Sequence, residues 1–168
     1  MAFREIKIQD LSFNPFEKIG KQWMLITAGD EKKHNTMTAS WGAMGVMWGK
    51  NVVTVYIRPQ RYTKEFVDAQ EFFTVSFYGE KCREALNICG TKSGRDGDKE
   101  TEAGLTPYYL DGTTAFQEAE MIFVCKKQYH QEMKPELFDE KENDAKWYLD
   151  KDYHTLYMGE ITKILVRE

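Results

Sequence analysis

Cysteine is scarce in this chain, and the three residues that occur form no recognisable framework. They stand at Cys82, Cys89 and Cys125, an odd number without a Cys-x-x-Cys pair. This spacing argues against a small fold stabilised by disulfide bonds and against a zinc site formed by cysteines. Cys82 and Cys89 share helical spacing with Ala85 and Leu86, so we expect both thiols on the packed face of a helix. Three free thiols suit a reducing compartment.

Long apolar runs are also lacking. No segment approaches the roughly 18–20 consecutive apolar residues of a membrane-spanning helix. Residues 1–10 alternate apolar and charged side chains, unlike the continuous apolar run of a signal peptide. These absences predict a cytoplasmic protein that has no membrane partner.

Positive charge is not in excess. The chain has 23 Lys and Arg against 27 Asp and Glu, a net charge of −4, and its cations are dispersed. This argues against nucleic acid as the main partner. The histidines at 34, 130 and 154 lie far apart without acidic neighbours at ligand spacing, so no metal site is predicted. We expect His34 and His130 in solvent, whereas His154 either packs with a hydrogen bond or lines a ligand pocket.

The common nucleotide-binding and hydrolytic signatures are missing as well. There is no Gly-x-Gly-x-x-Gly fingerprint and no phosphate loop of the Walker kind. Ser40 and Ser93 lack the context of a nucleophile elbow. A nucleotide, if bound, must therefore be held by separate strand ends and loops, and no side chain is indicated as a catalytic nucleophile.

What the sequence does contain is enough apolar surface for one folded domain. Of its 168 residues, 42% are hydrophobic and 14% aromatic, and no repeat or linker divides residues 1–168. Strands are many and helices few and short, which favours a mainly β antiparallel barrel over a doubly wound sheet. Strands are predicted at 3–8, which could also be an extended arm, and at 23–28, 35–44, 51–57, 72–78, 116–129 (as one strand or two), 154–161 and 162–166. Helices are predicted at 63–69 with Thr63 as N-cap, at 80–89 with Gly90 as C′ residue, and as a single turn at 99–103. Residues 131–150 are predicted to be irregular.

Three polar segments stand out between these elements. The first is Asn35-Thr36-Met37-Thr38-Ala39-Ser40-Trp41, where side-chain alternation along a strand places Thr36, Thr38 and Ser40 on one face. A row of small hydroxyls suits a polar ligand with many oxygens. The second segment, Arg58-Pro59-Gln60-Arg61-Tyr62-Thr63, carries two guanidinium groups at a strand-to-helix junction, an arrangement that can bind a phosphate.

The third polar segment, residues 89–96, follows a helix and contains two glycines, two cations and two hydroxyls. Backbone N–H groups in such a loop can form an anion nest. For both cationic segments the alternative is that they are solvated turns. Trp41, Met44, Met47 and Trp48 also have two interpretations, since they could pack in the core or form a wall against a flat ring.

Taken together, the three polar segments and residues 73–77 resemble the flavin reductase-like family, close to flavoredoxin. The matching segments follow one another in the same order from about Trp23 to Pro107, and residues 154–160 match more weakly. The charged segment 131–150 departs from the family pattern. It implies a split antiparallel β-barrel of Greek-key type that binds FMN, commonly as a homodimer with the flavin near the subunit interface. The cofactor-binding residues that it implies are Asn35, Thr36, Met37, Thr38, Ala39, Ser40, Trp41, Arg58, Pro59, Arg61, Tyr62, Thr63, Cys89, Gly90, Lys92, Ser93, Gly94 and Arg95.

The resemblance leaves two functions open. One is an FMN-dependent oxidoreductase that passes electrons from NADH or NADPH through FMN to an acceptor, the flavin supplying the redox chemistry. The other is an FMN-binding electron carrier reduced by a protein partner. A third and more remote hypothesis is a binding domain without a cofactor.

Overall fold

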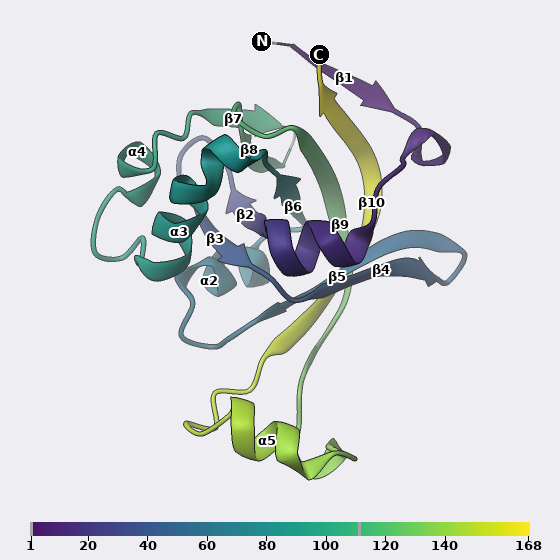
Figure 1. Ribbon diagram of the computed structural model, residues 1–168, viewed down its shortest axis with the longest axis vertical. Coiled ribbons are helices and arrows are strands. Elements are labelled where there is room, and N and C mark those ends of the chain that lie inside the picture. Colours follow the sequence, from purple (N-terminus) through teal and green to yellow (C-terminus); the bar gives the residue numbers. More distant parts are fainter. Residues whose placement is uncertain (1, 111) are drawn as a thin grey trace.

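The chain is built around one antiparallel sheet. The computed structural model describes residues 2–110 and 112–168, and its eight-stranded sheet has the order β3-β2-β6-β9-β10-β5-β4, with β1 added to β10 (Figure 1). The mainly β antiparallel class that the sequence predicts is confirmed. The strands of this sheet are β1 (Phe3–Ile6), β2 (Met24–Gly29), β3 (His34–Ala39), β4 (Gly42–Met47), β5 (Lys50–Ile57), β6 (Phe72–Phe77), β9 (Met121–Glu132) and β10 (Thr155–Arg167), while β7 (Pro107–Leu110) and β8 (Thr113–Phe116) form a separate hairpin.

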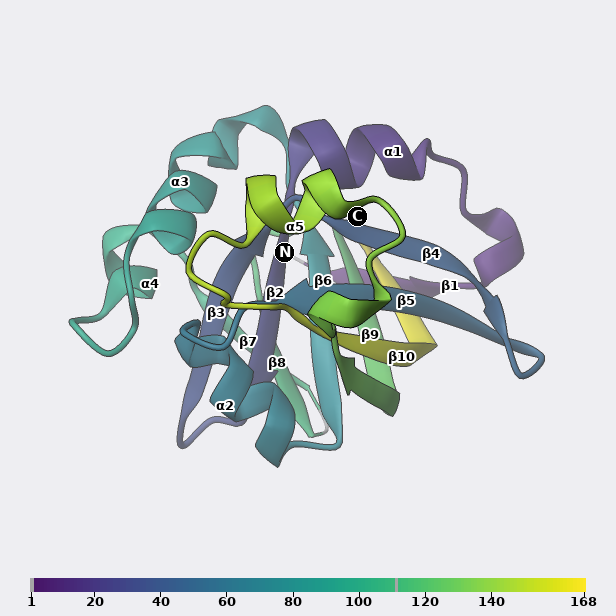
Figure 2. The same cartoon turned by 90° about the horizontal axis from the view of Figure 1, so that it is seen from below.

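The helices are short and lie around the sheet (Figure 2). The first α-helix begins where the side chain of Asn14 accepts hydrogen bonds from the backbone N–H groups of Phe16 and Glu17, with Pro15 at the first helical position. No helix among the described residues is long and apolar enough to cross a membrane. The helical elements are η1 (Ile8–Asp10), α1 (Pro15–Glu17), η2 (Lys18–Gln22), α2 (Tyr62–Ala69), η3 (Glu80–Cys82), α3 (Arg83–Thr91), α4 (Lys99–Glu102), η4 (Pro135–Leu137) and α5 (Lys141–Trp147).

A two-residue link closes the sheet on itself. Strands β3 and β4 follow one another in the chain, yet they lie at opposite ends of the strand order. Only Ser40 and Trp41 join them, and consecutive Cα atoms are about 3.8 Å apart, so the two sheet edges must meet here. We call this link the seam. The sequence-based prediction of one strand over 35–44 was wrong at this point, because residues 42–47 pair with β5 instead of extending β3.

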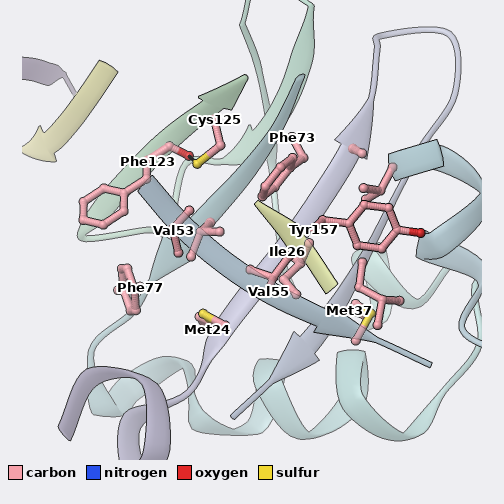
Figure 3. Close-up of a cluster of buried hydrophobic side chains, with 14 of the residues drawn as sticks. Met24, Ile26, Met37, Val53, Val55, Phe73, Phe77, Phe123, Cys125 and Tyr157 are labelled. Atoms are coloured by element: carbon pink, nitrogen blue, oxygen red, sulfur yellow. Dashed lines mark hydrogen bonds between the residues drawn. The ribbon is translucent and has the colours of Figure 1, made fainter. Parts of the chain in front are cut away.

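The interior of the curved sheet is filled with apolar side chains (Figure 3). Alternation along β5 places Val53, Val55 and Ile57 in this core, each without exposed surface. On β10, Gly159 passes so close to the neighbouring strands that a Cβ atom would lie 2.7 Å from a Phe73 ring carbon and 2.8 Å from Cβ of Cys125. A side chain there would force the strands apart, so only glycine fits.

Several predicted boundaries differ in the structure. Arg61, and not Thr63, occupies the N-cap position of α2, and Gly90 lies within the last turn of α3. The segment 131–150, predicted to be irregular, contains the end of β9, η4 and α5. This region stands at the end of the molecule opposite the chain termini (Figure 1).

Candidate functional site

The three polar segments of the sequence meet around one small cavity. It has a volume of about 110 Å³ and is lined by residues 60–63 and 90–94 together with Asn35 and Lys99; we call it the polar cavity. The side-chain amide of Asn35 on β3 donates to the hydroxyl of Thr63 in α2 at 2.7 Å. Gly94 approaches from the third segment, where a Cβ atom would lie 2.0 Å from Oδ1 of Asn35. The close approach therefore requires glycine at position 94.

Two cations without a carboxylate partner face the polar cavity. Arg61 donates to the carbonyl oxygens of Gly90 and Cys89 at 3.1 and 3.4 Å. Lys99 is only 4% exposed and donates to the carbonyl oxygens of Cys89 and Lys92 at 3.2 and 3.1 Å. Neither forms an ion pair with a described carboxylate, although buried cations are normally paired.

Burial lowers the pKa of both Lys99 and Arg61, because loss of water disfavours their charged forms. The last carbonyls of α3 stabilise the two cations in part, because the helix dipole is negative at this end. An anion in the polar cavity would match the remaining positive charge. This chemistry fits a phosphate group.

The other two cations of the third segment are used differently. Lys92 and Arg95 are exposed and form ion pairs with Glu102 and Glu65, respectively. Arg95 also donates to the carbonyl oxygen of Gln60 at 3.2 Å, and its guanidinium lies 4.5 Å from the centre of the Tyr62 ring. These contacts hold the loop against α2.

The two arginines of the second segment have separate roles in the structure. Arg58 donates to the carboxylate of Asp152 at 2.7 Å and to the carbonyl oxygen of Trp147 at 2.9 Å. It therefore ties the end of β5 to the chain around α5. Arg61, by contrast, is directed to the polar cavity and the end of α3.

A second cavity leads from Arg61 to the seam. This middle cavity of about 220 Å³ is lined by residues 37–41, Tyr56, Arg58, Arg61, Trp147 and His154. The hydroxyls expected to form a free row are mostly engaged within the protein. Thr36 is fully buried and contacts Thr27 at 2.8 Å, and Thr38 donates to the carbonyl oxygen of Leu86 at 2.5 Å. Of the three hydroxyls in the expected row, at Thr36, Thr38 and Ser40, that of Ser40 in the seam is the one without a partner among the described residues.

A larger cavity adjoins the middle one. This apolar cavity, of about 660 Å³, lies between residues 15–20, the seam with the start of β4, and the chain from Met133 to His154. Five residues line both the middle and the apolar cavity, so the two are continuous: Ser40, Trp41, Tyr56, Trp147 and His154.

His154 lies at the junction of the middle and apolar cavities. It is 7% exposed, its Nδ1 atom lies 2.7 Å from the hydroxyl of Tyr148, and its ring lies 5.3 Å from that of Trp41. Burial, reinforced by the charge of Arg58, lowers the pKa of His154 to about 4. The packed, hydrogen-bonded interpretation is confirmed. The ring also lines a cavity, and ligand binding there stays a prediction.

The remaining histidines and the apolar stretch after the seam have mixed outcomes. His130 is exposed, as predicted. His34 is largely buried and bonds to Glu100 at 2.8 Å, so the prediction that it is solvated was wrong. Core packing holds for Met44 alone, because Trp41, Met47 and Trp48 are exposed. The four lie on or beside β4, a strand most of whose residues are exposed.

The structure sorts the implied cofactor residues into three groups. Asn35, Arg61, Tyr62, Thr63, Gly90, Lys92, Ser93 and Gly94 line the polar cavity; Met37, Thr38, Ala39, Ser40, Trp41 and Arg58 line the middle one; Thr36, Pro59, Cys89 and Arg95 line neither.

Sequence reasoning missed Lys99, Tyr56 and Trp147. The side chain of Asp98 caps α4 and marks the helix start, but it carries no signal for the contact of Lys99 with the end of α3. In the part of the chain that the structure describes, no three His, Cys, Asp or Glu side chains are grouped as a metal site requires.

Known proteins share this arrangement of strands. Residues 16–168 match the family model of the flavin reductase like domain. No curated protein matches the sequence. At identities below 25% the likeness to solved structures is one of fold.

An FMN-binding domain of a flavin reductases-like enzyme from Shewanella baltica superposes with a TM-score of 0.69 at 15% identity, covering 98% of this chain and 77% of that one. Flavoredoxin of Desulfovibrio vulgaris gives 0.68 at 21%, covering 87% and 69%. A protein with a split barrel domain from Shewanella frigidimarina gives 0.67 at 20%, covering 88% and 68%. The split barrel expected from the sequence is thereby confirmed. Because the family model matches residues 16–168, nearly the whole length, this chain belongs to the flavin reductase-like family.

Proposed function

We propose that this chain binds FMN and acts as an oxidoreductase that passes electrons from NADH or NADPH through FMN to an acceptor. The observation that carries the proposal is a pair of cations without a described carboxylate partner, the half-buried Arg61 and the buried Lys99, in the polar cavity at one end of the row of cavities. FMN, when bound, supplies the redox chemistry. The relatives described as FMN-binding or as flavoredoxins support the same assignment.

Each part of the series of cavities suits one part of FMN. Arg61, Lys99 and the backbone of residues 93–94 would hold the phosphate, because charge-assisted hydrogen bonds favour a dianion there. The backbone of residues 38–41 and the free hydroxyl of Ser40 would contact the polar chain and the ring edge. Trp41 would exclude water from one side of the ring, since its indole lines the middle cavity.

The reductase step is tested by anaerobic mixing of the FMN-loaded protein with NADH or with NADPH. We expect the flavin absorbance band to bleach within minutes with one of them, as it does with dithionite. Bleaching by dithionite alone would reject direct reduction by a nicotinamide. A carrier fed by a protein partner would then describe the chain better. Absence of the flavin band after loading and gel filtration would reject the FMN site itself.

A further inference from the structure

A histidine at the start of β3 holds α4 against the sheet. Nε2 of His34 lies 2.8 Å from a carboxylate oxygen of Glu100, and Nδ1 lies 3.0 Å from the carbonyl oxygen of Asp30. The side chains of His34 and Glu100 are only 13% and 15% exposed. The His34 ring also packs edge-on against Tyr109 and Phe116 of the β7–β8 hairpin. The pair therefore lies between three parts of the fold and is largely shielded from solvent.

The two contacts of the His34 ring identify its charged form. A carbonyl oxygen and a carboxylate can only accept hydrogen bonds, and a neutral imidazole has a single N–H group to donate. Both contacts are made at once only when both ring nitrogens carry a proton, which is the imidazolium form. The hydrogen bond to Glu100 accordingly raises the pKa of His34. His34 and Glu100 thus form an ion pair, in which the two charges offset one another.

The residue before Glu100 is Lys99, one of the two cations of the polar cavity. Lys99 donates to the carbonyl oxygens of Cys89 and Lys92 at the end of α3. The helix that carries both residues, α4, has four residues, so it is too short to be stable by itself. Lys99 attaches it to α3, and Glu100 attaches it to β3. Loss of the Glu100 contact would therefore leave Lys99 less firmly held.

His34 lies beside the polar cavity and not in its wall. It lines an adjacent cavity of about 360 Å³, which shares Asn35, Gly94 and Lys99 with the polar cavity. We propose that protonated His34 is a positioning residue for the polar cavity: through Glu100 it holds Lys99 where the phosphate group binds, and loss of its proton weakens that binding. This inference rests on the proposed function, because the phosphate is that of FMN.

Other ionisable groups surround the pair, and their titration has to be separated from that of His34. Backbone hydrogen bonds lower the pKa of Asp30, and a hydrogen bond from Thr101 lowers that of Asp98. Burial raises the pKa of Cys89 to about 11. None of these three therefore changes charge between about pH 7 and 9. The groups that face His34, Glu100 or Lys99 are Asp30, Lys32, Lys33, Arg61, Cys89, Asp98 and Tyr109.

Lys99 itself offers the competing explanation of a pH effect. Burial lowers its pKa, so its own deprotonation would also weaken phosphate binding as the pH rises. A variant of His34 separates the two causes, because it removes the titration of the histidine and keeps that of the lysine.

The test compares FMN with riboflavin, which lacks the phosphate, by fluorescence titration of the FMN-free full chain at pH 7 and pH 9. The ratio of the two dissociation constants measures the preference for the phosphate, which is largely a dianion throughout this range. We expect this preference to fall about tenfold in the native protein between the two pH values. In His34→Gln it should already be low at pH 7 and change little. His130→Gln, at an exposed histidine, is the matched control and should behave as the native protein does.

Two further variants distinguish positioning from a simple effect of charge. Glu100→Ala removes the contact together with a negative charge. Positioning predicts a weaker phosphate preference at pH 7, whereas charge alone predicts an equal or stronger one. In a Lys99→Ala background, His34→Gln should cause no further loss, because His34 acts through Lys99. An equal or stronger preference in Glu100→Ala, or a full additional loss in the double variant, would contradict the inference.

The outcomes also separate this inference from the proposed function. If the native protein prefers FMN at pH 7 but His34→Gln keeps the native pH dependence, titration of Lys99 explains that dependence and the inference is wrong, although the phosphate site stands. A preference that does not change with pH would likewise reject the inference alone. If the native protein binds the two flavins equally at pH 7, the polar cavity does not hold the phosphate, and the inference fails together with the proposed site.

Discussion

The side-chain amide of Asn35 and the hydroxyl of Thr63 meet at 2.7 Å, and this hydrogen bond joins β3 to the first turn of α2 beneath the polar cavity. Both side chains are buried. The bond therefore fixes two of the three segments that surround the cavity, and its loss would leave a buried polar group unsatisfied.

Thr63→Val should lower the free energy of unfolding by about 1–3 kcal/mol, because it leaves the amide of Asn35 without its best acceptor in a buried site. Thr91→Val is a matched control, since Thr91 makes its hydrogen bond to the carbonyl oxygen of Asn87 in an exposed position. Urea denaturation measures both. Equal losses of unfolding free energy in the two variants would show that the hydrogen bond between Asn35 and Thr63 stabilises the protein no more than an exposed one does.

Arg61→Ala and Lys99→Ala should each weaken FMN binding about tenfold or more, because each removes a charge-assisted contact worth about 1.5–3 kcal/mol. Riboflavin, which lacks the phosphate, should bind the native protein more weakly than FMN and should be little affected by either variant. Fluorescence titration of the FMN-free protein measures these affinities.

Arg95→Ala provides the comparison for these two variants, because Arg95 is exposed and already paired with Glu65. Its effect on FMN binding should be smaller. Equal affinities for FMN and riboflavin would remove the phosphate from the polar cavity. An unchanged affinity in Arg61→Ala would move the role to Lys99 or to Arg58, Lys92 and Arg95.

Two histidines should give opposite pH dependences of stability. The hydrogen bond that the His34 ring donates to the carboxylate of Glu100 raises the pKa of His34, so its contribution to stability is complete below about pH 6.5 and is lost as the pH rises through the raised value. Burial lowers the pKa of His154 to about 4, so stability is present above about pH 6.5 and falls as the pH drops toward 4. Each slope is at most about 1.4 kcal/mol per pH unit.

The variants His34→Gln and His154→Gln isolate the contribution of each histidine to the pH dependence of stability. The difference in unfolding free energy between native protein and His34→Gln should be larger at pH 5.5 than at pH 8.5. The difference between native protein and His154→Gln should fall from pH 7.5 to pH 4.5. Urea denaturation across this pH range checks both, and parallel curves for either pair would refute that assignment.

The protein should form a homodimer that covers the exposed apolar ridge after the seam. Val46 is 71% exposed and Trp48 is 56% exposed, and Tyr129 lies beside Trp48 with ring centres 6.3 Å apart. An obligate interface buries on the order of 2,000 Å² or more. Light scattering at micromolar concentration should give twice the mass of the chain, and the double variant Val46→Ser, Trp48→Ser should give the monomer. A monomer mass for the native protein would reject the dimer.

Much of the site could be predicted because its chemistry is local in sequence. The segments around Asn35, Arg61 and Gly94 carry their polar side chains in short runs, and the fold then brings the runs together. Lys99 was missed because its role depends on a contact with the end of α3, which no local pattern encodes. The burial of Thr36 was missed for a related reason, since its partner Thr27 lies on the neighbouring strand.

The seam and α5 show where pattern reading fails for physical reasons. Residues 36–44 keep the composition of one strand, and only the pairing of Gly42–Met47 with β5 separates them. The segment 131–150 is rich in charge, which hides the aromatic residues that matter. Phe138 and Tyr148 of this segment pack on each other and on Tyr153, which follows it, with ring centres 4.9 to 6.1 Å apart.

The position of α5 bears on how a chain of this family could change what it accepts. None of the residues of α5 is buried, and the segment lies between the ends of β9 and β10, away from the core. Insertions and substitutions are tolerated best in such places, because they leave strand register and core packing intact. Selection could therefore rebuild one wall of the apolar cavity residue by residue, while the cationic end of the site and the barrel that supports it stay the same.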